Sequence, residues 1–445
     1  MFPILFLVNN IFITLAISIV FCCILRLFNI DKRIYTLICV ALLLHVALTL
    51  FIQTDLYKYH DPEVLRAPFF NDGECYSSNA LVISKTIKGE IFPLSEFKKY
   101  PGWGYVLVDV IKAAQNLRIL NIGEYQIGFI TYLYSVIYAA YGYLPSYINM
   151  LSILLNLITA LIIFKISGIL FNRRAGYIAA ALFLFNPTSF YYSTMKLKDP
   201  LYIFSFYLAI YLAVLFIHKR NVAYLLLMIL PLLLIKFLKI MFFEPFLLIL
   251  LIYFVTKFFS KRKLQFVVIP LAAIIFFLNL SFITERIRSF FVAAAQYQAN
   301  IFSSGGYTYK LLIFGPDVLG YNYLQMVAYF INAWYHLLME PILTINMSFI
   351  LLAYHPIKII FVFLYILAVL GIISSFRYQG FNYRENVLLL SFLFFIGSII
   401  AMTSGNIGTM LRQKDLITPV IFIYAAYFIS RLNLNVSINQ NRSLR

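Results

Sequence analysis

The sequence predicts an all-α polytopic membrane protein with about eleven transmembrane helices and two long outer loops that carry interfacial helices. Two observations lead to this fold class. Hydrophobic residues make up 63% of the 445 residues and charged residues only 12%, whereas soluble domains contain roughly 45–50% and about 25%. The apolar residues also gather in runs of about 20, the length that an α-helix needs to cross the hydrocarbon core of a bilayer. The chain is therefore expected to form a single integral-membrane domain over 1–445.

The connections between the predicted spans alternate between ones that are rich in Lys and Arg and ones that are not. The spans cover residues 3–25, 34–52, 146–170, 175–193, 199–217, 221–237, 240–258, 264–282, 357–376, 386–404 and 416–431. Lys and Arg are concentrated in every second connection, and the positive-inside rule assigns these connections to the cytoplasm. The N-terminus is therefore predicted outside and the C-terminus in the cytoplasm.

The charge and the cysteines exclude several classes of function. The net charge is +18, but the basic residues lie in short clusters between apolar runs and form no single basic face for nucleic acid. Cys22, Cys23 and Cys39 lie within predicted spans and only Cys75 lies in a polar segment, so no disulfide framework is expected. The five histidines are scattered singly, which argues against a histidine metal site.

Two long connections lie on the outer side, over residues 53–145 and 283–356. A structureless loop of this length is unusual in a compact protein, so both are expected to contain structure. The aromatic stretches 126–143 and 323–340 fit helices that lie at the level of the lipid headgroups. Interpreting 126–143 as a further span would break the alternation of charge downstream.

The first outer loop contains an acidic stretch at Asn71–Tyr76. Asp72, Glu74 and Tyr76 are expected to converge if this segment begins a helix, since residues four apart share a helical face. The alternative is that Asp72 only caps a helix in a solvent-exposed loop, because it precedes a run in which apolar residues recur with helical spacing.

Two basic segments precede predicted spans on the outer side. In Lys196-Leu197-Lys198-Asp199-Pro200, Asp199 is the expected N-cap and Pro200 the first helical residue. A helix start beside two lysines is a candidate anion site, and the alternative is that the lysines reach for lipid headgroups. Arg412 and Lys414 precede Asp415 in the same arrangement, and positive charge on the outer side favours a phosphate ligand.

Three further residues are weaker binding candidates. Lys236 and Lys239 lie at the tip of a tight hairpin, where pairing with Glu244 is the alternative to ligand binding. Tyr307 follows a glycine pair that could shape a sugar or lipid site, and a simple turn is the alternative.

The order of these features resembles the GT-C glycosyltransferases that use polyprenyl-phosphate-linked sugars, near the protein mannosyltransferase and lipid A aminoarabinose transferase families. The resemblance is clearest over about 70–220. Beside the acidic stretch and Lys198-Asp199, it is carried by the segments Tyr100–Tyr105, Leu170–Gly176, Asn186-Pro187 and Tyr192-Ser193, and by a tyrosine-rich helix that ends at Gly142.

The resemblance implies an inverting hexosyl- or pentosyltransferase that acts on the outer face of the membrane. It implies a catalytic acid at Asp72, with Glu74 as the rival because Gly73 separates two carboxylates that are adjacent in many members. Lys198, Arg412 and Lys196 would hold the carrier phosphate. The first outer loop follows two spans here, which is a further departure from the family.

The donor, the acceptor and the location follow as expectations. The Lys-, Ile-, Phe- and Asn-rich composition suggests an AT-rich bacterial genome, hence an inner (plasma) membrane and an undecaprenyl-phosphate carrier. The acceptor is a glycan, a lipid or a protein. No cofactor is required, although Asp72 and Glu74 could hold one divalent ion.

Two rival functions remain open from the sequence. A lipid-linked oligosaccharide flippase would favour internal repeats and ionisable residues near the bilayer midplane, whereas this chain keeps most of its charges at span ends. An O-antigen polymerase or ligase would use arginines in the outer loops, and Arg286 and Arg288 keep that alternative open.

Overall fold

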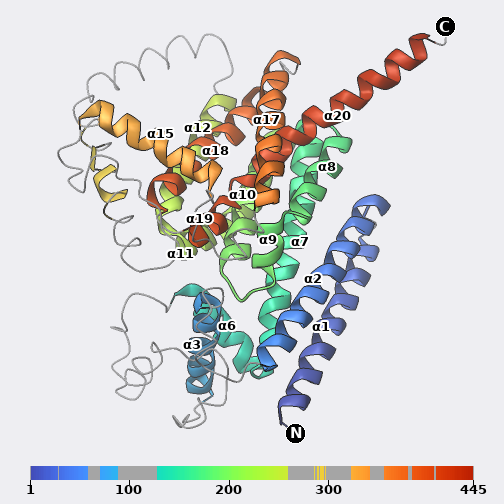
Figure 1. Ribbon diagram of the computed structural model, residues 1–445, viewed down its shortest axis with the longest axis vertical. Helices are drawn as coiled ribbons and strands as arrows, with labels where there is room; N and C mark the ends of the chain where they lie inside the picture. Colours follow the sequence, from blue (N-terminus) through green and yellow to red (C-terminus); the bar gives the residue numbers. More distant parts are fainter. Residues whose placement is uncertain are drawn as a thin grey trace. The chain divides into compact units, whose positions relative to one another are not determined.

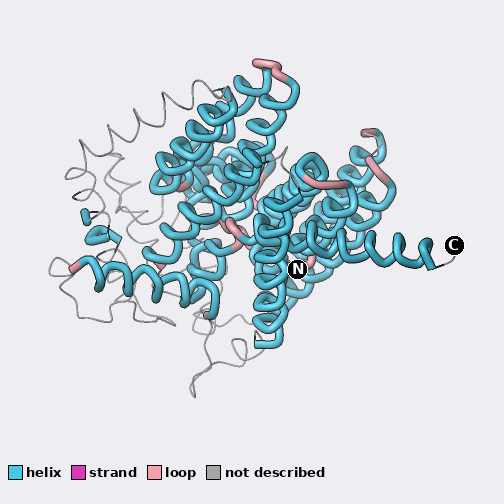
Figure 2. Tube along the Cα trace, turned by 90° about the horizontal axis from the view of Figure 1, so that it is seen from above, coloured by secondary structure: helices cyan, strands magenta, loops and turns pink. Residues whose placement is uncertain are grey.

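The computed structural model describes residues 2–28, 30–58, 71–88, 128–258, 322–340, 355–378, 383–404 and 407–443, together with a few positions between 285 and 296. Within these ranges every regular element is a helix (Figure 2). The predicted all-α class is therefore confirmed for the part of the chain that the structure describes.

Six of the described helices are long and apolar enough to cross a membrane. They are α1 (Phe2–Leu27), α2 (Lys32–Lys58), α7 (Pro145–Leu170), α10 (Asp199–Lys219), α17 (His355–Tyr378) and α18 (Tyr383–Thr403). A seventh span is formed if α19 (Ile407–Lys414) and α20 (Thr418–Ser443) count together, since they meet at a bend of 51°. All seven coincide with predicted spans, so the chain is a multi-pass membrane protein.

The number of eleven spans stays a prediction, and one predicted span has a different form. The stretch 175–193 is divided into α8 (Arg173–Leu184) and α9 (Pro187–Ser193). Pro187 has no N–H to continue a helix, and it forces Asn186 into an extended conformation. The predicted span 264–282 lies outside the described residues.

Two further apolar helices are shorter than the bilayer core is thick. These are α11 (Ala223–Leu238) and α12 (Ile240–Phe258), and α11 has 16 residues. At 1.5 Å per residue that length corresponds to about 24 Å, against a core of about 30 Å. Both helices lie where spans are predicted.

The two stretches predicted as interfacial form helices α6 (Phe129–Tyr141) and α15 (Tyr323–Met339), and the acidic stretch begins α3 (Asn71–Ile87). The location of α6 and α15 at the membrane interface stays a prediction. Helix α15 starts with a capping box, in which the side chains of Asn322 and Gln325 bond each other's backbone N–H. One face of α15 exposes Leu324, Val327, Ile331 and Tyr335. This apolar stripe is typical of a helix that lies in a membrane interface.

The chain divides into two compact units. The first comprises Met1–Ile162, Ala180–Ala209 and Ile229–Ile240, and the second comprises Ile163–Ala179, Ile210–Met228 and Met241–Arg445. Helices α7, α8, α10 and α11 continue from one unit into the other. The prediction of a single integral-membrane domain stays a prediction.

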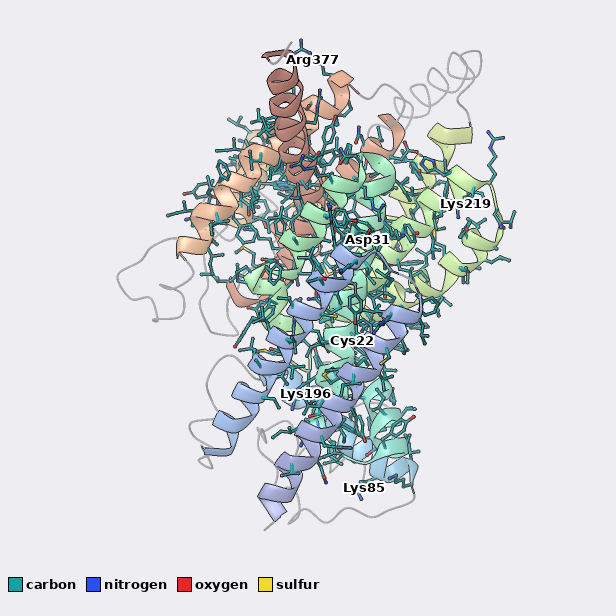
Figure 3. All side chains as sticks on the ribbon, turned by 90° about the vertical axis from the view of Figure 1, so that its right-hand side faces the viewer. Cys22, Asp31, Lys85, Lys196, Lys219 and Arg377 are labelled. Carbon is teal, nitrogen blue, oxygen red and sulfur yellow. The ribbon has the colours of Figure 1, made fainter. Side chains whose placement is uncertain are left out.

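In the first unit, α1 packs beside α2 and α3 packs beside α6 (Figure 1). The Sγ atoms of Cys22 on α1 and Cys39 on α2 are 3.7 Å apart, and Cys22 is labelled in Figure 3. The Asn10 side chain of α1 accepts a hydrogen bond from the backbone N–H of Ser146 at the start of α7.

In the second unit, α17 packs on α20 and α15 packs on α18. The first pair approaches so closely that a Cβ on Gly371 would collide with the backbone of Tyr424. In the second pair, the Trp334 ring stacks on Phe394 and the Tyr329 hydroxyl donates to the carbonyl of Met402 at 2.9 Å. These contacts fix α15 along α18.

Candidate functional site

The acidic start of α3 lies directly against the basic segment before α10. A Cβ on Gly73 would be 3.2 Å from the carbonyl carbon and oxygen of Lys196, which is closer than most side chains tolerate. The absence of a Cβ at Gly73 therefore lets the first turn of α3 approach the Lys196 backbone. The two segments that the sequence singled out separately are brought together within the first unit.

A second contact joins the same two segments. The Lys198 ammonium lies 5.8 Å from the centroid of the Tyr76 ring, within the range of a cation–π interaction. Position 72 lies one helical turn before Tyr76 and so shares this flank of α3. Position 74 lies about 200° around the helix from position 72, so positions 72 and 76 share a face of α3 that position 74 does not. The predicted convergence of the three side chains stays a prediction. The side chains of Asp72 and Glu74 are outside the described residues.

The two lysines of the basic segment have different surroundings. Lys196 is 8% exposed, whereas Lys198 is half-buried. A lysine that reaches for lipid headgroups keeps its ammonium in water. Lys196, which is labelled in Figure 3, is buried and does not fit that alternative. Helix α10 begins at Asp199, as predicted, and the Asp199 carboxylate accepts a hydrogen bond from the Tyr202 hydroxyl at 3.0 Å.

Helix α6 covers these segments with two buried tyrosines that sequence reasoning missed. The Tyr134 hydroxyl donates to the carbonyl of Leu197 at 3.3 Å. The Tyr138 hydroxyl lies 2.7 Å from the Ser77 hydroxyl of α3. Burial raises the pKa of Tyr134, and the nearby Tyr76 and Asp199 raise it further, so its phenol stays neutral and remains a hydrogen-bond donor. The sequence carried a signal for their position, since the two tyrosines are four residues apart and share one helical face.

The second unit holds Arg412 and Lys414, in the last turn of α19. Arg412 is half-buried there. Lys414 is only 4% exposed; its ammonium donates to the carbonyl of Leu338 at 3.2 Å and lies 5.4 Å from the ring centroids of Phe361 and Tyr365. Lys414 is thus surrounded by groups of the protein itself, and its role in donor binding stays a prediction.

A histidine–carboxylate pair at the end of α15 is a further polar feature that sequence reasoning missed. His336 Nδ1 lies 2.7 Å from Glu340 Oε1, and Glu340 is 4% exposed. The spacing of four residues within a helix is the signal that could have revealed the pair.

The remaining predicted site residues are not brought to either segment by a described contact. Lys236 lies in the last turn of α11, and Lys239 joins α11 to α12. Their pairing with Glu244 stays a prediction. Tyr307 and Arg286 lie outside the described residues.

Among the residues that the structure describes, no three His, Cys, Asp or Glu side chains gather as ligands of one metal ion. The side chains of Asp72 and Glu74 lie outside the described residues, so a divalent ion at this pair stays a prediction.

Comparison with known protein families gives a match over part of the chain. Residues 129–282 match the family model of the dolichyl-phosphate-mannose-protein mannosyltransferases, a region that includes α6, the Leu170–Gly176 segment and the basic segment before α10. No curated protein and no solved structure matches the chain significantly. The family match and the apolar spans agree with the resemblance that the motifs predicted, and together they support a membrane glycosyltransferase of the GT-C type.

Proposed function

We propose that this protein transfers a sugar from a polyprenyl-phosphate carrier to a hydroxyl acceptor at the outer face of the membrane. The observation that carries the proposal is the meeting of the acidic start of α3 with the basic segment before α10. Gly73 lies against the Lys196 backbone, and Tyr76 lies beneath Lys198. A carboxylate and two ammonium groups on adjoining turns are the components that transfer from a lipid phosphate requires.

Each component has one task in the reaction. The carboxylate takes the proton of the acceptor hydroxyl as its oxygen attacks the anomeric carbon. The bond from that carbon to the phosphate oxygen breaks, and the electron pair leaves with the lipid phosphate. Lys196 and Lys198 stabilise the negative charge of the leaving phosphate, which is more effective in a partly dry site than in water. Attack opposite to the leaving group inverts the anomeric configuration.

Asp72 is the proposed base, in preference to Glu74. Position 72 shares the Tyr76 flank of α3, and Tyr76 is the residue that contacts Lys198. Position 74 lies on the other flank of the helix. The base and the leaving-group ligands must serve one anomeric carbon, which favours the residue on the flank of Lys198.

Two carboxamide variants test this assignment. Asp72→Asn keeps the shape of the side chain but cannot accept a proton, so turnover is expected to fall by about 10²–10⁴-fold, the usual share of general base catalysis. Glu74→Gln is expected to cost less. Sugar transfer by the purified protein in proteoliposomes is the measurement. The matched control is Asp31→Asn, because Asp31 is a carboxylate whose described partner is the backbone N–H of Arg33 in the α1–α2 turn.

The outcomes are distinct. Full turnover in Asp72→Asn together with loss in Glu74→Gln would transfer the role to the other carboxylate. Full turnover in both variants would overturn the proposed function at this site.

The resemblance extends the proposal to residues beyond the first unit and to the identity of the lipid. By the resemblance, Arg412 is a further phosphate ligand and the acceptor is a glycan, a lipid or a protein. The proposed carrier is an undecaprenyl phosphate in a bacterial inner membrane. The family match supports a lipid-linked donor. The assignment of Arg412 rests on the sequence alone.

A further inference from the structure

The inner face of α6 makes polar contacts with two different parts of the first unit. Tyr134 donates to the carbonyl of Leu197 in the basic segment. Tyr138, one turn further along, bonds Ser77 of α3. Both tyrosines are 1% exposed, so these contacts are shielded from water.

The opposite face of the same helix behaves differently. Tyr132 lies about 200° around the helix from Tyr134 and is 46% exposed, as expected for a tyrosine at the level of lipid headgroups. A general preference for aromatic residues in an interfacial helix accounts for Tyr132, and it does not account for hydroxyl contacts to α3 and to the basic segment.

We propose that Tyr134, Tyr138 and Gly73 are positioning residues that set the separation between the carboxylate-bearing start of α3 and the basic segment at Lys196–Lys198. The inference rests on the proposed function, because it concerns the alignment of the proposed base with the proposed phosphate ligands. The three residues act from two directions. The tyrosines tie both segments to α6, and Gly73 sets the distance at which the segments touch.

The alignment matters because the base and the leaving phosphate must act on one carbon atom. A displacement of about 1 Å in a catalytic arrangement can cost on the order of 100-fold in rate. A Cβ at position 73 would require a shift of a few tenths of an ångström at Lys196, since it would lie 3.2 Å from two backbone atoms. Such a shift is expected to reduce kcat by about 10-fold.

A purely structural role makes a different prediction. Buried tyrosine hydroxyls generally have hydrogen-bond partners in any protein, so their loss could lower thermal stability without a specific effect on catalysis. Gly73→Ala separates the two roles, because alanine is the better helix former. If the contact served only the fold, the helix propensity of alanine would offset the strain and kcat would be unchanged.

The experiment compares Gly73→Ala, Tyr134→Phe and Tyr138→Phe with two matched controls. Tyr132→Phe removes an exposed hydroxyl from the same helix. Gly168→Ala adds a Cβ to a helical glycine of α7 where nothing lies within 4 Å. For each variant, kcat and the donor KM are measured in proteoliposomes, and the melting temperature is measured in detergent.

The proposal predicts that the three test variants lower kcat by about 3- to 10-fold while the donor KM stays unchanged, which is the pattern for interactions that count only in the transition state. The controls keep the kcat of the unmodified protein. Values of kcat in Gly73→Ala and both tyrosine variants that equal those of the controls would overturn the inference. Losses of kcat that appear only where the melting temperature falls in proportion would also overturn it.

Failure of this inference is distinguishable from failure of the proposed function. If Asp72→Asn and Glu74→Gln both keep full turnover, the proposed function fails at this site. If Asp72→Asn is inactive and the positioning variants match their controls, only the positioning role fails.

Discussion

At the scale of single residues, the basic segment before α10 is the best-defined part of the candidate site. Lys198 lies over the Tyr76 ring, and Lys196 is buried behind Gly73. Burial and the Tyr76 ring restrict these two side chains before any ligand binds. In the proposed reaction, this order reduces the conformational entropy that binding of a lipid phosphate would cost.

Removal of one positive charge should weaken donor binding. Lys198→Ala is expected to lower the affinity for a polyprenyl-phosphate sugar by about 10-fold, since a charge-assisted hydrogen bond contributes roughly 1.5–3 kcal/mol. Donor binding to the purified protein is the measurement, and Lys85→Ala, in the last turn of α3, is the control. Equal affinities in Lys198→Ala and Lys85→Ala would exclude Lys198 as a ligand.

Arg412 is expected to show a graded response. Arg412→Ala should weaken donor binding, and Arg412→Lys should restore only part of it, because a point charge lacks the two-pronged geometry of the guanidinium group. The same binding assay reports both variants. Full recovery with lysine would indicate a role for the charge alone, and unchanged binding in Arg412→Ala would remove this residue from the phosphate site.

The sequence revealed the ionisable residues of the site but not the contacts between them. The run of apolar residues with helical spacing after Asp72 predicted a helix start, and α3 begins at Asn71. The approach of Gly73 to Lys196 could not be predicted, because no local pattern records which backbone lies opposite a glycine. Tyr134 and Tyr138 were attributed to the membrane interface for a similar reason, since composition does not distinguish the two faces of α6.

At the scale of elements, close approach of helices depends on particular glycines. A Cβ on Gly176 of α8 would lie 2.7 Å from the carbonyl oxygen of Phe164 and 2.9 Å from its ring. Here α8 turns back against α7 after the Leu170–Phe171 end of that helix. The sequence predicted both helices, whereas the division of 175–193 into α8 and α9 depends on Pro187 and was missed.

Gly176→Ala should therefore destabilise the protein. Overpacking at such a contact costs typically about 1–3 kcal/mol, and the melting temperature in detergent is expected to fall. Gly168→Ala is the control, because it adds the same methyl group to α7 where nothing lies within 4 Å. A melting temperature for Gly176→Ala at or above that of the control would contradict the close packing of α7 and α8.

At the scale of the whole molecule, the apolar runs predicted the membrane class and the positions of the long spans. In the bilayer core every backbone polar group must be hydrogen-bonded within the protein, so a long apolar run that crosses it forms a helix. The predicted apolar runs accordingly coincide with α1, α2, α7, α10, α17 and α18. The total of eleven could not be settled in the same way. A shorter helix such as α11 is apolar enough to be counted and yet is less than one bilayer core in length.

The predicted topology can be measured by cysteine labelling. In a background without the native cysteines, an impermeant reagent applied from outside should label cysteines placed near Lys88 and Gly306. It should not label Arg262→Cys, which lies in a cytoplasmic connection by the charge bias. Labelling of Arg262→Cys from outside would reverse the orientation and place the acidic stretch on the wrong side for the proposed reaction.

The central claim is that the chain transfers a sugar from a lipid phosphate, and donor consumption tests it most directly. The purified protein in proteoliposomes is supplied with a radiolabelled sugar on three carriers in parallel, a polyprenyl phosphate, a polyprenyl diphosphate and a nucleotide. The proposal predicts that only the polyprenyl phosphate loses its sugar, that free polyprenyl phosphate accumulates, and that Asp72→Asn prevents both. Consumption of the nucleotide-linked or diphosphate-linked sugar, with the polyprenyl-phosphate sugar left intact, would contradict the account.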